Sequence, residues 1–274
     1  MHVRTLAALA TASGAAFLAA AAPAPPAAAS FVTQPPPGPR SEGAGGGGAV
    51  AMGATGAGAV PVVATEATRA VRAVEAVEAE GAVGADELRA STAGCDPVSK
   101  GSYAEDAGAE ATVPVCGAKG AVYWKADLDV ACDGLESAIC NRENDPWYLP
   151  DTAVRQSDGR PLDAATLPYV VVPTPGPIWK YYESGIRGGG IVAVVHRDRV
   201  RYGVVGDTGP AKIIGEASYA MARALGIDSD PVGGGVPSGV TYILFAGSEA
   251  DPVESRTSAT TRGEELARAF LTSN

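Results

Sequence analysis

The Trp, Tyr and Cys residues are confined to one part of the chain. All three Trp, all nine Tyr and all four Cys lie at or beyond Cys95 in a sequence of 274 residues. The roughly 180 residues from Ser91 onward are enough to bury a hydrophobic core. We therefore expect a single folded domain over residues 91–274.

The preceding residues fall into three segments of different composition. Residues 1–29 join the basic stretch MHVR to an Ala-rich apolar run that ends in AAAS, a pattern typical of a secretory signal peptide. A transmembrane anchor is the weaker alternative, because Gly14 and Pro23 interrupt the run and no basic cluster follows it. Residues 30–63 are predicted to be a Gly/Pro/Ala-rich linker, and residues 64–90 a marginal helix or a disordered extension. The sequence thus predicts a secreted, extracellular protein without a membrane attachment after signal removal.

An even number of cysteines in an exported chain predicts disulfides. Four cysteines allow three pairings, and we favour Cys95–Cys116 with Cys132–Cys140 because local closure is the simplest topology. A zinc site is disfavoured, since no C-x-x-C pair exists and His196 is the only histidine beyond the signal. No metal ion and no other cofactor is expected.

The charge of the chain is strongly negative. The formal net charge is −10, and from Ser91 onward 24 acidic residues face 16 basic ones. No nucleic acid is expected as a partner, because binding to phosphates requires Lys and Arg. A cationic partner suits this surface, although acidity can also serve solubility alone. We expect a monomer.

Strand patterns predominate in the expected domain. Apolar runs rich in β-branched and aromatic residues predict strands over residues 121–132, 167–175 and 239–248, and a hairpin over 190–207 that turns at Arg197 and Asp198. One helix is predicted over 215–227, ending at Gly226, and a second over 261–271. The second begins with the capping box Thr261-x-x-Glu264. The pattern indicates a mainly β (α+β) fold, a compact β-barrel with one or two packed helices.

Two acids stand close together in the stretch GVVGDTGPAKIIGEAS, at Asp207 and Glu216. Asp207 ends an apolar strand and Glu216 is expected in the first turn of a helix, so each has a structural alternative: capping a turn for Asp207 and interacting with the helix dipole for Glu216. A Ser–His–Asp triad would have to use His196, which lies in mid-strand, and no G-x-S-x-G motif is present. Phosphate-binding glycine spacings are absent as well.

A second group of acids lies in KADLDVACDG, at Asp127, Asp129 and Asp133. Asp127 and Asp129 are two residues apart on a predicted strand and so share a face. The spacing does not match a calcium-binding EF-hand loop. These acids are either a solvated strand end or an acidic strip that binds cationic sugars.

Three segments, in this order, resemble the fungal-type chitosanases of glycoside hydrolase family 75: YWKADLDVACDG, GVVGDTGPAKIIGEAS and GVTYILFAGS. The resemblance covers roughly residues 95–247. It implies an endo-acting hydrolase that cleaves the β-1,4 linkages of chitosan with inversion. It also implies that Asp207 and Glu216 are the two essential acids.

An inverting hydrolase needs one carboxylic acid to protonate the leaving oxygen and one carboxylate to activate water. We expect Glu216 to be the acid and Asp207 the base. Expected substrate contacts are Asp127, Asp129, Asp133 and Thr208, with Tyr123 and Trp124 for ring stacking, while Trp147, Tyr148, Trp179, Tyr181 and Tyr182 are further aromatic candidates. The alternatives are an inverting hydrolase of another polysaccharide, such as a β-glucan, and a non-catalytic module that binds wall polysaccharides.

Overall fold

The computed structural model describes residues 82–274. The signal peptide predicted over residues 1–29, the linker over 30–63 and the part of the 64–90 segment before residue 82 lie outside the described residues. Within the described part of the chain, no helix has the length and apolar character needed to cross a membrane.

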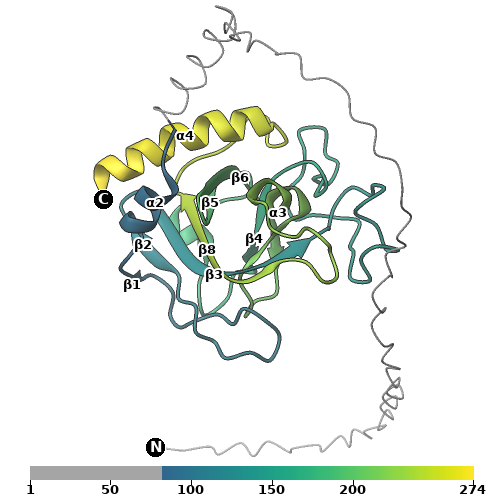
Figure 1. Ribbon diagram of the computed structural model, residues 1–274, viewed down its shortest axis with the longest axis horizontal. Helices are drawn as coiled ribbons and strands as arrows, with labels where there is room; N and C mark the ends of the chain where they lie inside the picture. The colour runs from purple at the N-terminus through teal and green to yellow at the C-terminus, as the bar shows by residue number, and fades with distance from the viewer. Residues whose placement is uncertain (1–81) are drawn as a thin grey trace, which may run out of the picture. The chain divides into compact units, whose positions relative to one another are not determined.

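The described chain contains eight strands, three α-helices and one 3₁₀ helix (Figure 1). In chain order these elements are α2 (Ala85–Ser91), β1 (Asp96–Pro97), β2 (Cys116–Ala118), β3 (Ala121–Ala131), β4 (Tyr169–Pro173), η1 (Tyr181–Ser184), β5 (Ile191–His196), β6 (Arg199–Gly209), β7 (Glu216–Ser218), α3 (Tyr219–Leu225), β8 (Val236–Phe245) and α4 (Arg256–Ser273).

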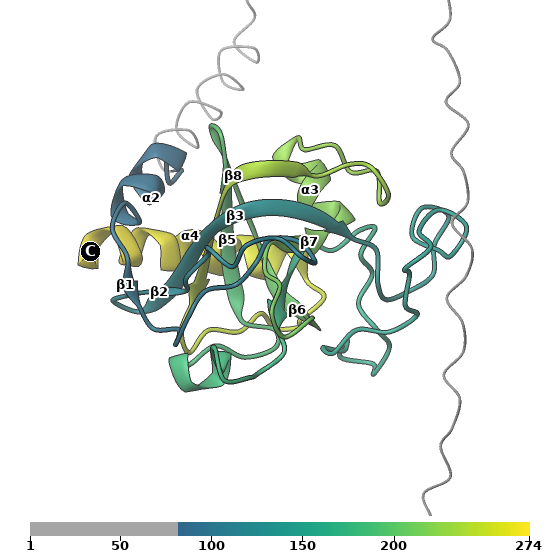
Figure 2. The ribbon, with the colours of Figure 1, turned by 90° about the horizontal axis from the view of Figure 1, so that it is seen from below.

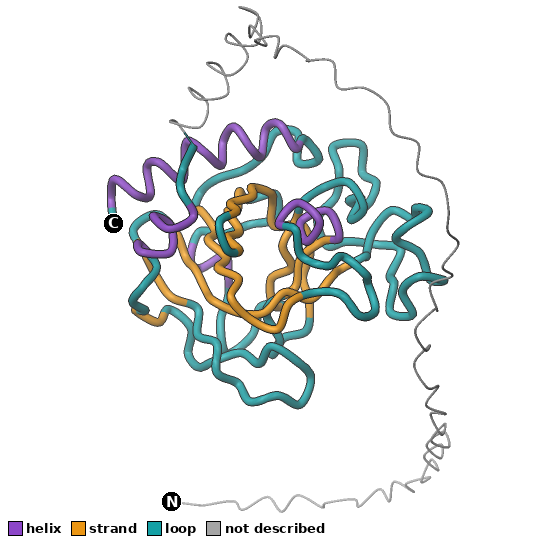
Figure 3. The backbone as a smooth tube through the Cα atoms, in the orientation of Figure 1, coloured by secondary structure: helices purple, strands orange, loops and turns teal. Residues whose placement is uncertain are grey.

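Six of the strands close into a barrel, which Figure 3 shows as a ring. The order is β3-β7-β4-β6-β5-β8, and β8 pairs back onto β3. The β3–β7 and β4–β6 pairs are parallel, whereas the other barrel pairs are antiparallel. The predicted mainly β, barrel-like fold is confirmed.

Alternation along the strands divides the buried side chains into two clusters. One cluster takes residues from all six barrel strands, including Trp124 and Tyr242, together with Met221 of α3. The other combines the opposite strand faces with α2 and α4, through residues such as Leu88 and Phe270. Figures 1 and 2 show α4 lying along the outside of the barrel. Leu88 is fully buried, so α2 is packed onto the domain.

The hairpin and the end of the first helix are confirmed, whereas two predicted helix starts are wrong. Arg197 has φ 52° between β5 and β6 and turns the hairpin, and Gly226 closes α3 with φ 71°. Helix α3 begins only after its N-cap Ser218. Helix α4 begins after Ser255, whose hydroxyl accepts a hydrogen bond from the Ser258 N–H, so the proposed box at Thr261 lies inside the helix.

Both predicted disulfides are present, Cys95–Cys116 and Cys132–Cys140. The second bond closes a short loop directly after β3 and buries both of its sulfurs in the core. This loop carries Asp133, so the disulfide holds an acid of the candidate site beside the barrel.

Candidate active site

Glu216 lies on strand β7 and not in a helix, which corrects the sequence prediction. It pairs in register with Asp129 of the parallel strand β3, so both side chains leave the same face of the sheet. Helix α3 begins three residues later, and its N-cap is Ser218. The helix dipole therefore does not act on Glu216 as a first-turn carboxylate, because that effect is confined to the terminal turn.

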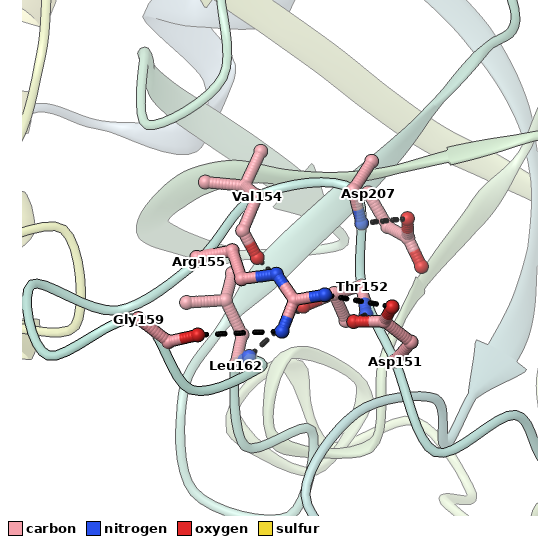
Figure 4. Close-up of polar contacts among 8 residues, drawn as sticks. Asp151, Thr152, Val154, Arg155, Gly159, Leu162 and Asp207 are labelled. Atoms are coloured by element: carbon pink, nitrogen blue, oxygen red, sulfur yellow. Dashed lines mark hydrogen bonds and ion pairs between the residues drawn. The ribbon is translucent and has the colours of Figure 1, made fainter.

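Asp207 lies near the end of strand β6, beside the loop that runs from Asp151 to Val154 (Figure 4). The backbone N–H groups of Ala153 and Thr208 both donate to Asp207 Oδ1, at 2.7 and 2.8 Å. These two bonds fix the orientation of the carboxylate and leave its second oxygen without a described partner. Asp207 therefore does cap a turn, through Oδ1, and its second oxygen can still act in catalysis.

A single strand, β4, separates the two acids. Val171 is the register partner of Asp207, and the pairing of Val170 with Ala217 puts Val171 opposite Glu216 as well. Two strand spacings correspond to about 9–10 Å between the backbones. Gly209 provides space between them, because a Cβ at this position would lie 3.3 Å from Glu216 Oε2. The Glu216 carboxylate therefore reaches across β4 toward the end of β6.

The side chain of Glu216 lines an acidic cleft of about 530 Å³. Six carboxylate side chains line this cleft, and among the described residues that line it there is no Lys, Arg or His. The six are Glu105, Asp106, Asp129, Asp133, Asp145 and Glu216. Every charged side chain that the described residues contribute to this cleft is therefore acidic.

Burial raises the pKa of several of these acids, and neighbouring charges and hydrogen bonds modify the shift. Burial, reinforced by the charges of Asp133 and Asp207, raises the pKa of Glu216 to about 7. Burial also raises the pKa of Asp133 to about 6, against a hydrogen bond from the Leu149 N–H. For Asp207, burial raises the pKa above its usual value, while the bonds from Ala153 and Thr208 oppose the rise. The pKa of Glu216 is thus raised by burial and by like charges together, whereas Asp207 accepts two hydrogen bonds that favour its charged form.

Several residues that were predicted to contact the substrate lie away from this cleft. For two of them, Trp124 and Tyr123, the prediction of ring stacking is wrong. Trp124 is 1 % exposed and stacks on Tyr242 in the core, with ring centroids 5.2 Å apart. Tyr123 is 5 % exposed, and its hydroxyl donates to the Gly94 carbonyl. Both are core residues and do not offer a face to a sugar ring. Asp207 and Thr208, near the end of β6, are not among the residues that line this cleft.

Three further acids that line the cleft were not predicted from the sequence. Glu105 and Asp106 come from a loop that a bridge between Ala104 and Ile213 holds next to β7. Asp145 belongs to the long segment between β3 and β4 and accepts a hydrogen bond from the N–H of Trp147. Trp147, which the sequence offered only as one of several aromatic candidates, is 73 % exposed at the cleft and is suited to stack on a sugar ring.

A larger hollow of about 830 Å³ lies elsewhere, next to Trp179 and Lys180. Glu183 is the only carboxylate among its described lining residues, and it forms an ion pair with Lys180 at 3.2 Å. Acid–base hydrolysis of a glycosidic bond needs two carboxyl groups. The cleft at Glu216 is therefore the better candidate.

Comparisons with known proteins agree on one family. A family model described as fungal chitosanase of glycosyl hydrolase group 75 matches residues 128–270, a segment that includes Asp133, Asp207 and Glu216. The chain is 34 % identical over 146 residues to Endo-chitosanase B of Aspergillus oryzae, which covers 50 % of this chain and 60 % of that protein. It is 29 % identical over 169 residues to an Endo-chitosanase of Aspergillus fumigatus, covering 57 % and 71 %. The chain thus spans less than two thirds of the length of the first relative.

Proposed function

Because the chain belongs to the fungal chitosanases of glycosyl hydrolase group 75, we propose that it is an endo-acting hydrolase of the β-1,4 linkages of chitosan. The observation that carries this proposal is the cleft itself, with six carboxylates and no basic side chain among its described lining residues. Chitosan is a polycation in mild acid. A low-dielectric cleft lined by one sign of charge attracts and retains a ligand of the opposite sign.

Glu216 is the general acid in this proposal and Asp207 is the general base. A general acid must hold a proton at the working pH, and the raised pKa of Glu216, about 7, supports that role. A general base must be ionised, and the two backbone N–H donors at Asp207 favour its charged form. A helix dipole does not lower the pKa of Glu216, since this residue lies on a strand and not in the first turn of a helix.

The reaction follows as a single displacement. Glu216 gives its proton to the glycosidic oxygen as the C1–O bond breaks. Asp207 takes a proton from a water molecule whose oxygen attacks C1 from the opposite face. Inverting enzymes keep their carboxyl groups about 6.5–9.5 Å apart to admit this water, whereas retaining enzymes need about 5–5.5 Å. Strand β4 keeps the two backbones about 9–10 Å apart, and we propose the inverting course that the resemblance to the family implies.

Substrate contacts come from the acids that flank the pair. Asp129 is the register neighbour of Glu216, and Asp133 lies in the loop held by the Cys132–Cys140 disulfide. We propose that Asp133 binds a sugar ammonium group near the cleaved bond, while Asp129 borders the cleft beside Glu216. The two disulfides are in keeping with export to an oxidising compartment, and we propose that the protein acts outside the cell as a monomer.

Viscosity separates this function from its alternatives. The full chain should rapidly lower the viscosity of chitosan and leave a neutral β-glucan unchanged, because only chitosan presents cations to the cleft. A faster loss of viscosity with the β-glucan than with chitosan would indicate a β-glucan hydrolase instead. Binding to chitosan without any loss of viscosity would indicate a wall-binding module.

The pH dependence should be bell-shaped. Activity is expected to fall as the pH rises through about 7, because Glu216 then loses the proton that it must donate. It should fall on the acid side as Asp207 gains a proton, above the pH at which an ordinary Asp titrates. The test is kcat/KM on soluble glucosamine oligomers across pH, with binding to Glu216→Gln measured in parallel to isolate the titration of the substrate amines. A profile that still rises above pH 8 would contradict Glu216 as the acid.

A further inference from the structure

Three carboxylates converge beside the cleft, outside the catalytic pair. Asp127 and Asp129 leave the same face of strand β3, and Asp106 comes from the loop between β1 and β2. One oxygen from each lies within 4.8 Å of the other two. Oxygen ligands bind Ca²⁺ at about 2.3–2.6 Å, so two ligands of one ion lie at most about 5 Å apart. The three oxygens can therefore share a single ion.

Asp127 is the member of this cluster that requires a partner. Its side chain is 5 % exposed, and its Oδ1 is buried without a hydrogen-bond partner. The ion pairs found in residues 82–274 include none with Asp106, Asp127 or Asp129. A charged carboxylate is costly to bury, and coordination of a metal ion is one way to offset that cost. Asp106 and Asp129 are exposed and line the cleft, so the cluster opens to solvent on one side.

The surrounding backbone is arranged to admit this buried carboxylate. Gly215 has φ 120°, and a Cβ at that position would lie 1.8 Å from Asp127 Oδ1. Its carbonyl accepts a hydrogen bond from the Asp129 N–H at 2.8 Å. The loop that carries Asp106 is fixed to the same segment, since the N–H of Ile214 donates to the Ala104 carbonyl at 3.0 Å. One short segment before β7 thus holds all three acids in place.

We propose that Asp106, Asp127 and Asp129 bind a Ca²⁺ ion. Carboxylate oxygens are the ligands that hard cations prefer, and Ca²⁺ accepts six to eight of them in flexible geometry, with water completing the shell. A sugar ammonium group is less suited to this position, because Asp127 is not among the cleft-lining residues that a bound chain would touch. The ion neutralises acids at one side of the cleft, and one of its ligands, Asp129, is the register partner of Glu216.

Calorimetry on the full chain tests this site without measuring activity. After treatment with EDTA, titration with CaCl₂ should give one binding event with a dissociation constant no weaker than roughly millimolar, the range of extracellular calcium modules. Asp106→Asn and Asp129→Asn should each weaken calcium binding roughly tenfold or more, since even residues that only hydrogen-bond to metal ligands contribute that much. Both side chains are exposed, so these variants should keep the fold, and their thermal midpoints verify it.

Asp133→Asn is the matched control. It removes one carboxylate from the same cleft but not from the cluster, and its Oδ1 can still accept the hydrogen bond from the Leu149 N–H. Calcium affinity should stay at the wild-type value. The proposal is overturned if Ca²⁺ gives no binding event, or if Asp133→Asn weakens binding as much as the two cluster variants do. Neither result would bear on the hydrolase function, which the viscosity assay tests separately.

Discussion

Replacing Glu216 by Gln should lower kcat on glucosamine oligomers by roughly 10²- to 10⁴-fold, the contribution usual for a positioned general acid. Gln keeps the shape of the side chain but has no proton to give to the leaving oxygen. None of the described hydrogen bonds involves the Glu216 side chain, so the variant should fold and bind substrate normally. Its thermal midpoint should not fall, because an amide is less costly to bury than a carboxylate.

Glu105→Gln is the matched control for this result. Glu105 lines the same cleft, and Gln can still accept the 2.9 Å hydrogen bond from the Asp127 N–H. The Glu105→Gln substitution should raise KM more than it lowers kcat. If Glu216→Gln kept kcat within about tenfold of wild type, Glu216 would not be the general acid.

Replacing Asp207 by Asn should cause a similar loss of kcat, again roughly 10²- to 10⁴-fold, because an amide cannot take a proton from water. The amide oxygen can still accept the bonds from the Ala153 and Thr208 N–H groups. The adjoining loop should therefore stay in place. Asp151→Asn is the control: it removes a neighbouring charge that is ion-paired to Arg155 at the surface, and such pairs contribute little.

Oligomers with a dinitrophenyl leaving group distinguish the two roles. This leaving group departs without protonation, so Glu216→Gln should regain most of its lost rate on such a substrate. Asp207→Asn should not, because water activation is still required. The reverse pattern would exchange the two roles, and recovery by neither variant would contradict this pair as acid and base.

The sequence was sufficient for the barrel strands but not for the short strand that carries Glu216. Long alternating runs such as residues 121–131 have a clear period of two, and the structure confirms them. Strand β7 has only three residues, directly before a helix. Its strand character comes from pairing with Asp129 and the residues after it, which no local pattern reveals.

The same limit applies to the residues around the catalytic pair. Alternation placed Trp124 on a strand face but could not tell that this face is buried against Tyr242. Glu105 and Asp106 lie in a loop without a motif, and the bridge between Ala104 and Ile213 brings them to the cleft. The two acids themselves were found because the motifs around them resemble a family.

The configuration of the first-formed product is the decisive measurement. It tests whether two carboxylates on either side of β4 catalyse one inverting displacement. Proton NMR during hydrolysis of glucosamine oligomers, recorded before mutarotation, reports the anomer at the new reducing end. The account predicts that the α anomer appears first from the β-linked substrate. Initial accumulation of the β anomer would indicate retention through a covalent intermediate and would contradict it.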